Sequence, residues 1–297
     1  MNMKLVSVAE MALKWNVSER SVRNYCAEGR VEGARLKGKT WLIPENAKKP
    51  QRLNKSGKKN ALLLALKEQK ECKMKGGIYH KIQIEFTYNS NHIEGSKLTH
   101  DQTRYIYETN TIGAENDVVN VDDVIETVNH FRCIDKVIDR VNFDLSESFI
   151  KELHLVLKTG TADSRKDWFA VGEYKKLPNE VGGRNTTAPE NVHEEMAALL
   201  GSYNSGKRKT LEEIIAFHVA FERIHPFQDG NGRVGRLILF KECLKNNIVP
   251  FIIDDDMKLF YYRGLKEWNY EKGYLIDTCL AAQDKFKKYL DYFRIEY

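Results

Sequence analysis

Twelve consecutive residues, HPFQDGNGRVGR from His225 to Arg236, constrain this chain more than any other segment. Upstream, apolar residues recur at helical spacing as far as Ile224, and Pro226 cannot continue that helix. Downstream, the pattern predicts a second helix that starts near Gly232. The segment is therefore a glycine-containing turn that brings the N-terminus of one helix close to the end of another.

The turn combines residue types that suit a phosphate-bearing ligand and a proton transfer. They are His225, Asp229, Gly230, Asn231, Gly232, Arg233 and Arg236. Glycines at a helix N-terminus let several backbone N–H groups point at one anion, and the helix dipole adds to the attraction. A carboxylate beside phosphates commonly supplies the protein's share of Mg²⁺ coordination. A histidine whose ordinary pKa is about 6.5 can accept a proton from a hydroxyl at neutral pH.

Charge divides the chain of 297 residues into two parts. Residues 1–60 contain 14 Lys and Arg but only 5 Asp and Glu, whereas the remaining residues contain 33 and 37. Between Pro44 and Asn60, two prolines, a glycine and many lysines leave almost nothing to bury, which is typical of a linker. We therefore expect two domains, residues 1–50 and 61–297, joined by a linker at 51–60, with a polyanion as partner of the basic first domain.

The first domain shows the order helix, short turn, helix and hairpin. Ser7 and Glu10 form a capping box that opens the first helix, and residues 34–44 are typical of a hairpin. This order resembles the winged helix-turn-helix of MerR-type and excisionase-type proteins, whose second helix enters the major groove of DNA. A small basic domain that binds another protein is the alternative. The DNA contacts that the resemblance implies come from Arg20, Arg23, Lys37 and Lys39.

From Ala61 onward the apolar spacing is mostly helical, so the fold is expected to be mainly α. Val171–Pro189 breaks the pattern with five Gly or Pro residues and short extended pieces, and we interpret it as a small β-hairpin or flap. Gly201–Arg208 nearly matches a phosphate-binding loop. However, Arg208 stands where that loop needs a hydroxyl, and a helix rather than a strand precedes it, so we interpret this segment as a loop between helices.

HPFQDGNGRVGR matches the Fic motif, HPFx(D/E)GNGRxxR, at every defined position, and the similarity to Fic proteins extends over roughly residues 61–297. The resemblance implies a helical Fic domain with a hairpin flap, and transfer of AMP from ATP to a hydroxyl of a target protein or of the chain itself. The flap, Lys176–Gly183, would hold the target segment by strand pairing. Doc-type relatives, which phosphorylate, carry lysine at the position of Gly232, so the glycine favours nucleotide transfer.

The resemblance also assigns roles within the motif. By this similarity His225 is the base that activates the target hydroxyl, and Asp229 holds Mg²⁺. The phosphates would be bound by the other residues: Gly230, Asn231 and Gly232 through their backbone, and Arg233 and Arg236 through their guanidinium groups. The chemistry agrees, because this kind of transfer depends mainly on positioning and charge stabilisation.

SNHIEG, Ser90 to Gly95, matches the family's inhibitory motif, (S/T)xxxE(G/N), and ends a predicted helix near residues 78–95. Its place upstream of the Fic motif resembles the class with an N-terminal inhibitory helix. The implied role is that Glu94 pairs with Arg236 and so occupies the arginine that the γ-phosphate needs. An ordinary helix end with a surface glutamate is the alternative.

Other functions stay open beside a self-inhibited adenylyltransferase. A Fic enzyme could transfer UMP or phosphocholine, or remove AMP, and a DNA-binding regulator could use the Fic domain to sense nucleotide. An intact His225 argues against a pure sensor, because sensing needs no base. By the resemblance, Tyr261 and Tyr262 could stack on adenine, although tyrosines at helical spacing are often core residues.

Composition excludes several classes of protein. No apolar run approaches the roughly 18 residues of a membrane span, and Glu10 interrupts the place of a signal peptide. The five cysteines form no CxxC pair, so we expect a cytoplasmic protein without a disulfide framework or zinc site. The expected partners are ATP, Mg²⁺, a hydroxyl-bearing protein, and DNA through the first domain; no membrane is expected, and the resemblance also allows a homodimer.

Overall fold

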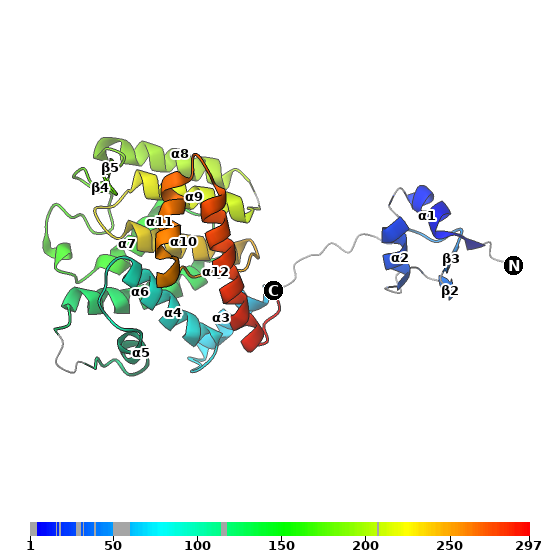
Figure 1. Cartoon of the computed structure of the whole chain (residues 1–297), viewed down its shortest axis with the longest axis horizontal. Helices are drawn as coiled ribbons and strands as arrows, with labels where there is room; N and C mark the ends of the chain where they lie inside the picture. Colours follow the sequence, from blue (N-terminus) through cyan, green and yellow to red (C-terminus); the bar gives the residue numbers. More distant parts are fainter. Residues whose placement is uncertain are drawn as a thin grey trace. The chain divides into compact units, whose positions relative to one another are not determined.

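The computed structural model describes residues 5–15, 17, 19–27, 31, 33–38, 40–49, 60–113, 118–206 and 208–297. It divides into two compact units, residues 1–58 and 59–297 (Figure 1). Apart from Asn60, the predicted linker lies outside the described residues. Lys39 and the side chain of Arg20, two of the four predicted DNA contacts, also lie outside them.

The N-terminal unit contains two helices and a small antiparallel sheet of strand order β1-β3-β2. Its elements are β1 (Leu5–Val6), α1 (Val8–Trp15), α2 (Glu19–Ala27), β2 (Arg35–Lys37) and β3 (Thr40–Pro44). The Ser7 backbone N–H donates to Glu10 Oε2 at 2.8 Å, and the Glu10 N–H donates to Ser7 Oγ at 3.2 Å, so the predicted capping box is present. Met11, Val22 and Ile43 are fully buried between the helices and the sheet.

The larger unit is mainly helical, as expected from the sequence. Its α-helices are α3 (Ala61–Glu71), α4 (Ile78–Ile93), α5 (His100–Thr109), α6 (Val121–Arg140), α7 (Glu147–Lys158), α8 (Val192–Asn204), α9 (Leu211–Ile224), α10 (Asn231–Lys245), α11 (Lys258–Glu267) and α12 (Gly273–Tyr292). Helices α9 and α10 pack against each other, as do α11 and α12 (Figure 1). In the described part of the chain, no helix combines the length and the apolar character that crossing a membrane requires.

Helix α10 is the most deeply placed helix of this unit, because every residue from Asn231 to Leu244 is buried. It contacts α4, α6, α7 and α9. Four buried charged residues lie on it, Arg233, Arg236, Lys241 and Glu242. A charge taken out of water needs a partner inside the protein. The positions of these partners decide which other segments must meet α10. Lys241 Nζ and Glu242 Oε1 form an ion pair at 2.8 Å. The two arginines instead pair with carboxylates that lie outside α10.

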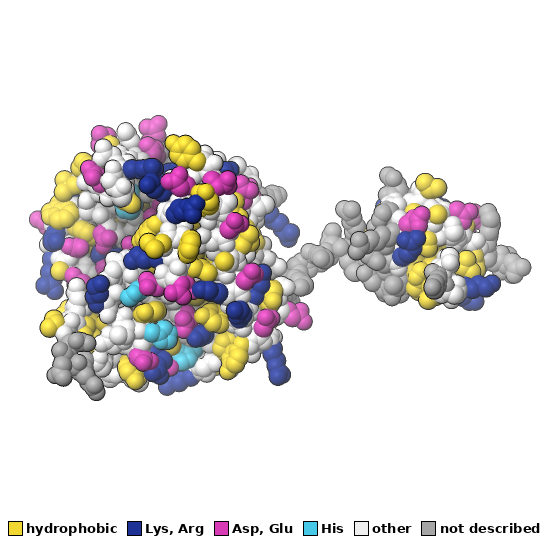
Figure 2. Space-filling view, viewed as in Figure 1, with side chains coloured by type: hydrophobic (Ala, Val, Ile, Leu, Met, Phe, Trp, Pro, Cys, Tyr) yellow, Lys and Arg dark blue, Asp and Glu magenta, His cyan; other side chains and the backbone are white. Residues whose placement is uncertain are grey.

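A short hairpin interrupts the helical pattern between Val171 and Pro189. Strand β4 (Glu180–Val181) pairs with β5 (Arg184–Asn185), and Gly182 and Gly183 turn between them with positive φ. All four strand residues are exposed. On the face of the larger unit seen in Figure 2, basic and acidic side chains are interspersed rather than gathered by sign.

Candidate active site

The turn between α9 and α10 is held closed by its own side chains. Asn231 accepts a hydrogen bond from the Phe227 N–H and donates one to the Phe227 carbonyl, both at 2.8 Å. The Phe227 ring is fully buried and stacks on His154, with ring centroids 4.0 Å apart. The Asn231 side chain therefore shapes the turn, and this residue can offer an anion only its backbone N–H.

The start of α10 presents unpaired backbone donors. The first intrahelical bond of α10 runs from Val234 N–H to the Gly230 carbonyl at 3.0 Å, so the N–H groups of Asn231, Gly232 and Arg233 have no intrahelical acceptor. Gly230 has φ +81°, a left-handed conformation that a glycine adopts without strain. The sequence predicted a backbone anion site at these residues, and N–H groups without an intrahelical acceptor are compatible with that prediction.

His225 ends α9 in a left-handed conformation, with φ 51° and ψ 61°. Its Nδ1 lies 3.3 Å from the backbone oxygen of Glu222. Because a carbonyl can only accept, this contact requires a proton on Nδ1 and leaves the lone pair on Nε2. Burial lowers the pKa of His225, and the Lys175 ammonium acts in the same direction. The imidazole is therefore neutral at pH 7 and able to accept a proton at Nε2.

Asp229 belongs to a network of four buried or half-buried charges. Its Oδ2 accepts from Lys158 Nζ at 2.7 Å and from Arg233 Nη2 at 3.2 Å. Glu126 of α6 closes the network by contacting both Lys158 and Arg233. Burial alone would raise the pKa of Asp229, but Arg233 and Lys158 overcome it and hold the pKa well below its usual value. Asp229 is therefore ionised at any physiological pH.

Glu126 and Lys158 were not predicted from the sequence. They lie 107 residues and 71 residues along the chain from the motif residues that they contact. A glutamate in the first half of a helix and a lysine at the end of another are common, so neither carries a local signal. The buried Arg233 needs a carboxylate besides Asp229, and this need is the only indication of a residue such as Glu126.

Arg236 contacts the end of α4, which carries the predicted inhibitory motif. Its Nη2 donates to Glu94 Oε1 at 2.7 Å and to the Ser90 carbonyl at 2.9 Å, and its Nε donates to Ser90 Oγ at 3.0 Å. The Arg236 side chain is 4% exposed and that of Glu94 is 27% exposed. Gly95 follows with φ +100° and turns the chain away from the helix.

Gly232 leaves space for the Glu94 carboxylate at the start of α10. A Cβ atom added at Gly232 would lie 2.2 Å from Glu94 Oε1 and 2.9 Å from Arg236 Nη1. Only a residue without a side chain leaves room for the carboxylate there. Glu94 thus lies over the same first turn of α10 that offers free N–H groups to an anion.

A cavity of about 750 Å³ opens beside the last turn of α9. The hairpin residues Val181 and Arg184 line one side, and Tyr262 and Lys266 of α11 line another. Tyr262 is 40% exposed and its hydroxyl donates to the Ile93 carbonyl at 3.3 Å, next to Glu94. The neighbouring residue, Tyr261, is 1% exposed, and its hydroxyl oxygen lies 2.6 Å from His218 Nε2. Tyr261 is therefore a core residue.

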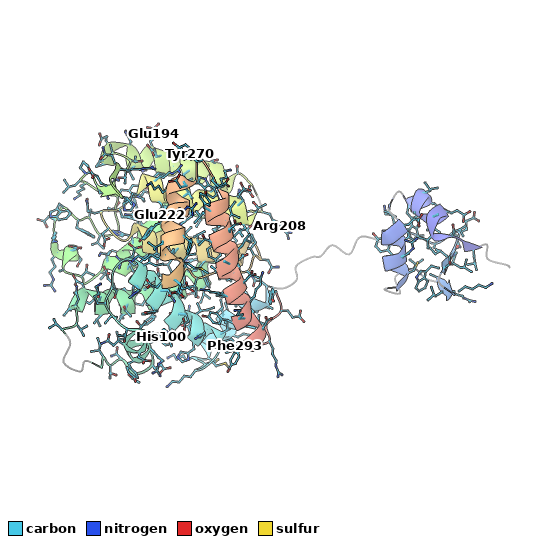
Figure 3. All side chains as sticks on the ribbon, in the orientation of Figure 1. His100, Glu194, Arg208, Glu222, Tyr270 and Phe293 are labelled. Atoms are coloured by element: carbon cyan, nitrogen blue, oxygen red, sulfur yellow. The ribbon has the colours of Figure 1, made fainter. Side chains whose placement is uncertain are left out.

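Glu222 also lines this cavity. In the view of Figure 3, Glu194 and Arg208 lie at the edge of the larger unit, whereas Glu222 lies over the middle of it. Burial raises the pKa of Glu222 to about 8. Within the described part of the chain, its Oε1 has no hydrogen-bond partner. A carboxyl that is largely protonated at pH 7 can donate a hydrogen bond into the cavity.

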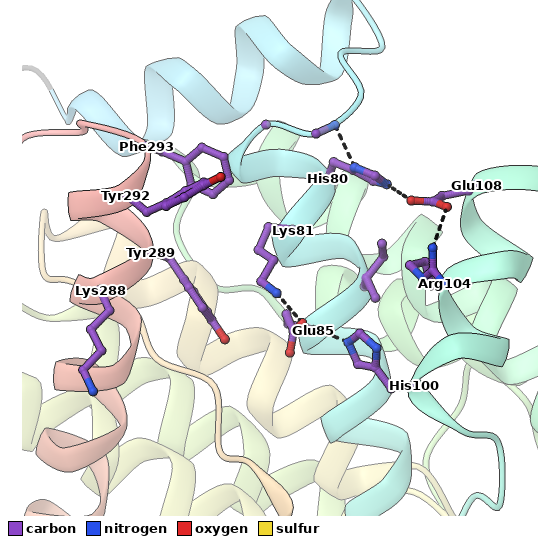
Figure 4. Close-up of a pocket in the computed structure, with 13 residues that line it drawn as sticks. His80, Lys81, Glu85, His100, Arg104, Glu108, Lys288, Tyr289, Tyr292 and Phe293 are labelled. Carbon is purple, nitrogen blue, oxygen red and sulfur yellow. Dashed lines mark hydrogen bonds and ion pairs between the residues drawn. The ribbon is translucent and has the colours of Figure 1, made fainter.

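A second cavity, of about 530 Å³, lies at the other end of α4, between α5 and α12 (Figure 4). Most of its charged side chains are paired with one another. Glu108 contacts His80 at 3.1 Å and Arg104 at 3.6 Å, and Glu85 contacts Lys81 at 2.7 Å and His100 at 2.9 Å. None of the motif residues lines either cavity, but the larger one lies beside the last turn of α9, which leads into the motif. The candidate active site is therefore the turn between α9 and α10 together with that cavity.

Comparison with known proteins supports this choice. Residues 144–242, which include the whole turn, match the Fic/DOC family. The protein adenylyltransferase fic-1 of Caenorhabditis briggsae is 27% identical over 189 residues, which are 61% of this chain and 35% of that relative. The protein adenylyltransferase Fic of Drosophila melanogaster is 27% identical over 192 residues, which are 62% of this chain and 37% of that relative.

A solved structure agrees with these matches. A Fic domain containing signaling protein from Bacteroides thetaiotaomicron VPI-5482 is 26% identical in sequence and superposes with a TM-score of 0.58. The alignment covers 77% of this chain and 90% of that protein's chain. Together these similarities support a Fic domain protein with the helical Fic fold. The alignments span little more than a third of the length of the curated relatives.

Proposed function

We propose that this protein is an adenylyltransferase that moves AMP from ATP to a hydroxyl of a protein. The observation that carries the proposal is the placement of His225, whose free Nε2 lies at the same turn as a backbone anion site. The relatives from Caenorhabditis briggsae and Drosophila melanogaster are protein adenylyltransferases, which supports the same reaction. The chain itself is one candidate for the target protein.

In the proposed reaction the target hydroxyl oxygen attacks the α-phosphorus of ATP. The new P–O bond forms as the bond from the α-phosphorus to the bridging oxygen breaks, and pyrophosphate leaves. His225 Nε2 takes the hydroxyl proton. The N–H groups at the start of α10, together with Arg233 and Arg236, stabilise the charge on the phosphates.

The cavity beside α9 suits the nucleoside part of ATP. Tyr262 offers a half-exposed ring, and Arg184 and Lys266 add positive charge to the walls. The hairpin β4–β5 covers one side and exposes its strand residues, which fits a flap that pairs with a target segment.

Asp229 fits a Mg²⁺ site that is completed by phosphates. Its carboxylate is ionised and its side chain is 47% exposed, while Lys158 and Arg233 engage only Oδ2. Among the residues that the structure describes, no group of three or more metal-ligating side chains gathers, which suits Mg²⁺ held by one carboxylate, phosphates and water. When bound, the ion would neutralise charge on the phosphates.

We further propose that Glu94 inhibits the enzyme. Glu94 is engaged with Arg236 and lies over the start of α10, so a γ-phosphate that needs Arg236 has to displace it. Ser90 makes two hydrogen bonds of its own to Arg236, and these would keep the guanidinium in place once Glu94 has left.

The proposed reaction is tested by the position of the label in ATP. Incubation with Mg²⁺ and α-labelled ATP is expected to give labelled protein, whereas γ-labelled ATP is expected to give none, because the γ-phosphate leaves in pyrophosphate. Label from the γ position would indicate phosphorylation instead. Parallel incubations with UTP and with AMP-modified protein distinguish UMP transfer and AMP removal.

DNA binding by the N-terminal unit is a second candidate function. Two helices followed by a hairpin form this unit, and Arg23 and the hairpin residue Lys37 are exposed. The surplus of Lys and Arg in residues 1–60 favours a polyanion over a neutral partner.

The full chain is therefore expected to bind duplex DNA with an affinity that falls steeply with salt, because phosphate contacts release counterions. Fluorescence anisotropy against a random duplex library measures this between about 50 and 200 mM salt. Arg23→Glu with Lys37→Glu should weaken binding and reduce the salt slope, whereas Lys166→Glu in the larger unit is the control. No binding at about 50 mM salt would favour a protein-interaction role.

A further inference from the structure

Lys175 is a buried lysine without an acidic partner. It is 3% exposed, and within the described residues no carboxylate lies within ion-pair distance of its ammonium. The other two deeply buried lysines of the larger unit, Lys158 and Lys241, contact carboxylates. Burial lowers the pKa of Lys175 to about 8, and the more distant Glu195 opposes this only in part. Because burying an unpaired charge is costly, this position calls for an explanation.

Three neutral oxygens surround the ammonium and use all three of its N–H donors. They are Asn179 Oδ1 at 2.8 Å, Thr186 Oγ1 at 2.6 Å and the Ile224 carbonyl at 3.2 Å. Asn179 immediately precedes β4 and Thr186 immediately follows β5, so the first two oxygens lie at the base of the hairpin. The third belongs to the residue before His225. One side chain therefore joins both ends of the hairpin to the end of α9.

The backbone strengthens the same connection. The Lys175 N–H donates to the Pro226 carbonyl at 2.8 Å, so Lys175 contacts the residues on both sides of His225. Asn179 Nδ2 donates to the Phe227 carbonyl at 3.0 Å. Within the hairpin, Thr186 also bonds Asn179 at the base, through its N–H and its hydroxyl, but the strands are only two residues long and exposed. An isolated hairpin of this kind is not stable in water.

We propose that Lys175 is a positioning residue that fixes the hairpin relative to His225. In the reaction proposed above, on which this inference rests, it sets where a target segment paired with the hairpin meets the base. Lys175 itself is not among the residues that line the proposed nucleotide cavity, although its partner Thr186 is. Loss of Lys175 should therefore impair use of a protein target more than binding of ATP.

The test compares Lys175→Met with wild type and with Lys241→Met, which removes a buried lysine elsewhere. Hydrogen exchange of the full chain is expected to quicken about tenfold or more at the amides of residues 175 and 186 in Lys175→Met, since a hydrogen-bonded charge is lost there. Lys241→Met breaks the buried pair with Glu242 and so lowers overall stability, but it should not quicken these two amides relative to the rest of the larger unit. Unchanged exchange in Lys175→Met would overturn the proposal.

A titration of the His225 ring followed by NMR gives a second readout that needs no activity. The charged groups that act on His225 are Lys175, Glu94 and Asp229. Removing the cation should raise the pKa of His225, whereas Lys241→Met should not change it. A His225 pKa equal to that of wild type in Lys175→Met would contradict the inference, even if no transfer activity were found.

If Lys175→Met does not fold, Thr186→Val tests the positioning role instead. It removes one acceptor at the half-buried base of the hairpin and leaves the charge in place. Faster exchange at residue 175 supports the positioning role, and wild-type exchange overturns it. Where transfer is measurable, Lys175→Met should raise KM for a protein acceptor more than it weakens ATP binding; equal losses for both substrates would indicate a merely structural role.

Discussion

Glu94→Gly is expected to raise transfer activity about ten- to a hundredfold, the largest gain that this site offers. Arg236 donates to Glu94 Oε1 or to a γ-phosphate, and the carboxylate also covers the start of α10. A charge-assisted contact of this kind contributes about 1.5–3 kcal/mol. Since about 1.4 kcal/mol corresponds to a factor of ten, its release shifts the productive population by one to two decades. Labelled ATP, several acceptors and several ATP concentrations measure the change.

Two controls make this experiment specific. Arg236→Ala in the Glu94→Gly background should abolish the gain, because the freed guanidinium is what the γ-phosphate uses. Glu190→Gly replaces an exposed glutamate far along the chain from Ser90–Gly95 and should leave labelling unchanged. Equal labelling by wild type and Glu94→Gly would mean that Ser90–Gly95 is an ordinary helix end.

His225→Ala should reduce transfer by about 10²–10⁴-fold in the Glu94→Gly background, because it removes the group that accepts the proton. ATP binding should persist, since the backbone donors of α10 and both arginines remain. Labelling measures the transfer activity, and a thermal-shift titration with ATP measures ATP binding.

Conformation adds a control to the His225 experiment. His225 has φ 51°, which costs alanine more than it costs asparagine. His225→Asn should therefore keep the turn and still lack the base. If either variant labels proteins at the parent rate, His225 is not the base. In the parent, burial lowers the pKa of His225, so activity should persist somewhat below the histidine's ordinary value of about 6.5 and be lost as pH falls further.

The sequence predicted those parts of the site that depend on neighbouring residues. Pro226 ends α9 and the glycines open α10, because backbone chemistry determines both. The capping box at Ser7 and Glu10 and the hairpin between Val171 and Pro189 are of the same kind. The predicted start of α10 differs by one residue, since Gly230 rather than Asn231 provides the left-handed cap.

Contacts between distant segments could not be predicted in the same way. Glu126, Lys158 and Lys175 join the site through tertiary packing, and nothing adjacent to them in the sequence marks their partners. Tyr261 and Tyr262 show the limit within a single helix. Successive residues face about 100° apart, so only the packing of α11 decides that one is core and the other lines the cavity.

The ion pairs of α10 determine which fragment of this protein can be excised. A piece limited to residues 144–242 would contain Arg233 and Arg236 but neither Glu126 nor Glu94. Removing one partner of a buried ion pair costs about 3–5 kcal/mol, a large share of the roughly 5–15 kcal/mol that stabilises a domain. Such a fragment should therefore aggregate or stay unfolded when expressed alone. The smallest autonomous piece has to reach back through α6 to α4, so the unit of folding is larger than the stretch that matches the Fic/DOC family.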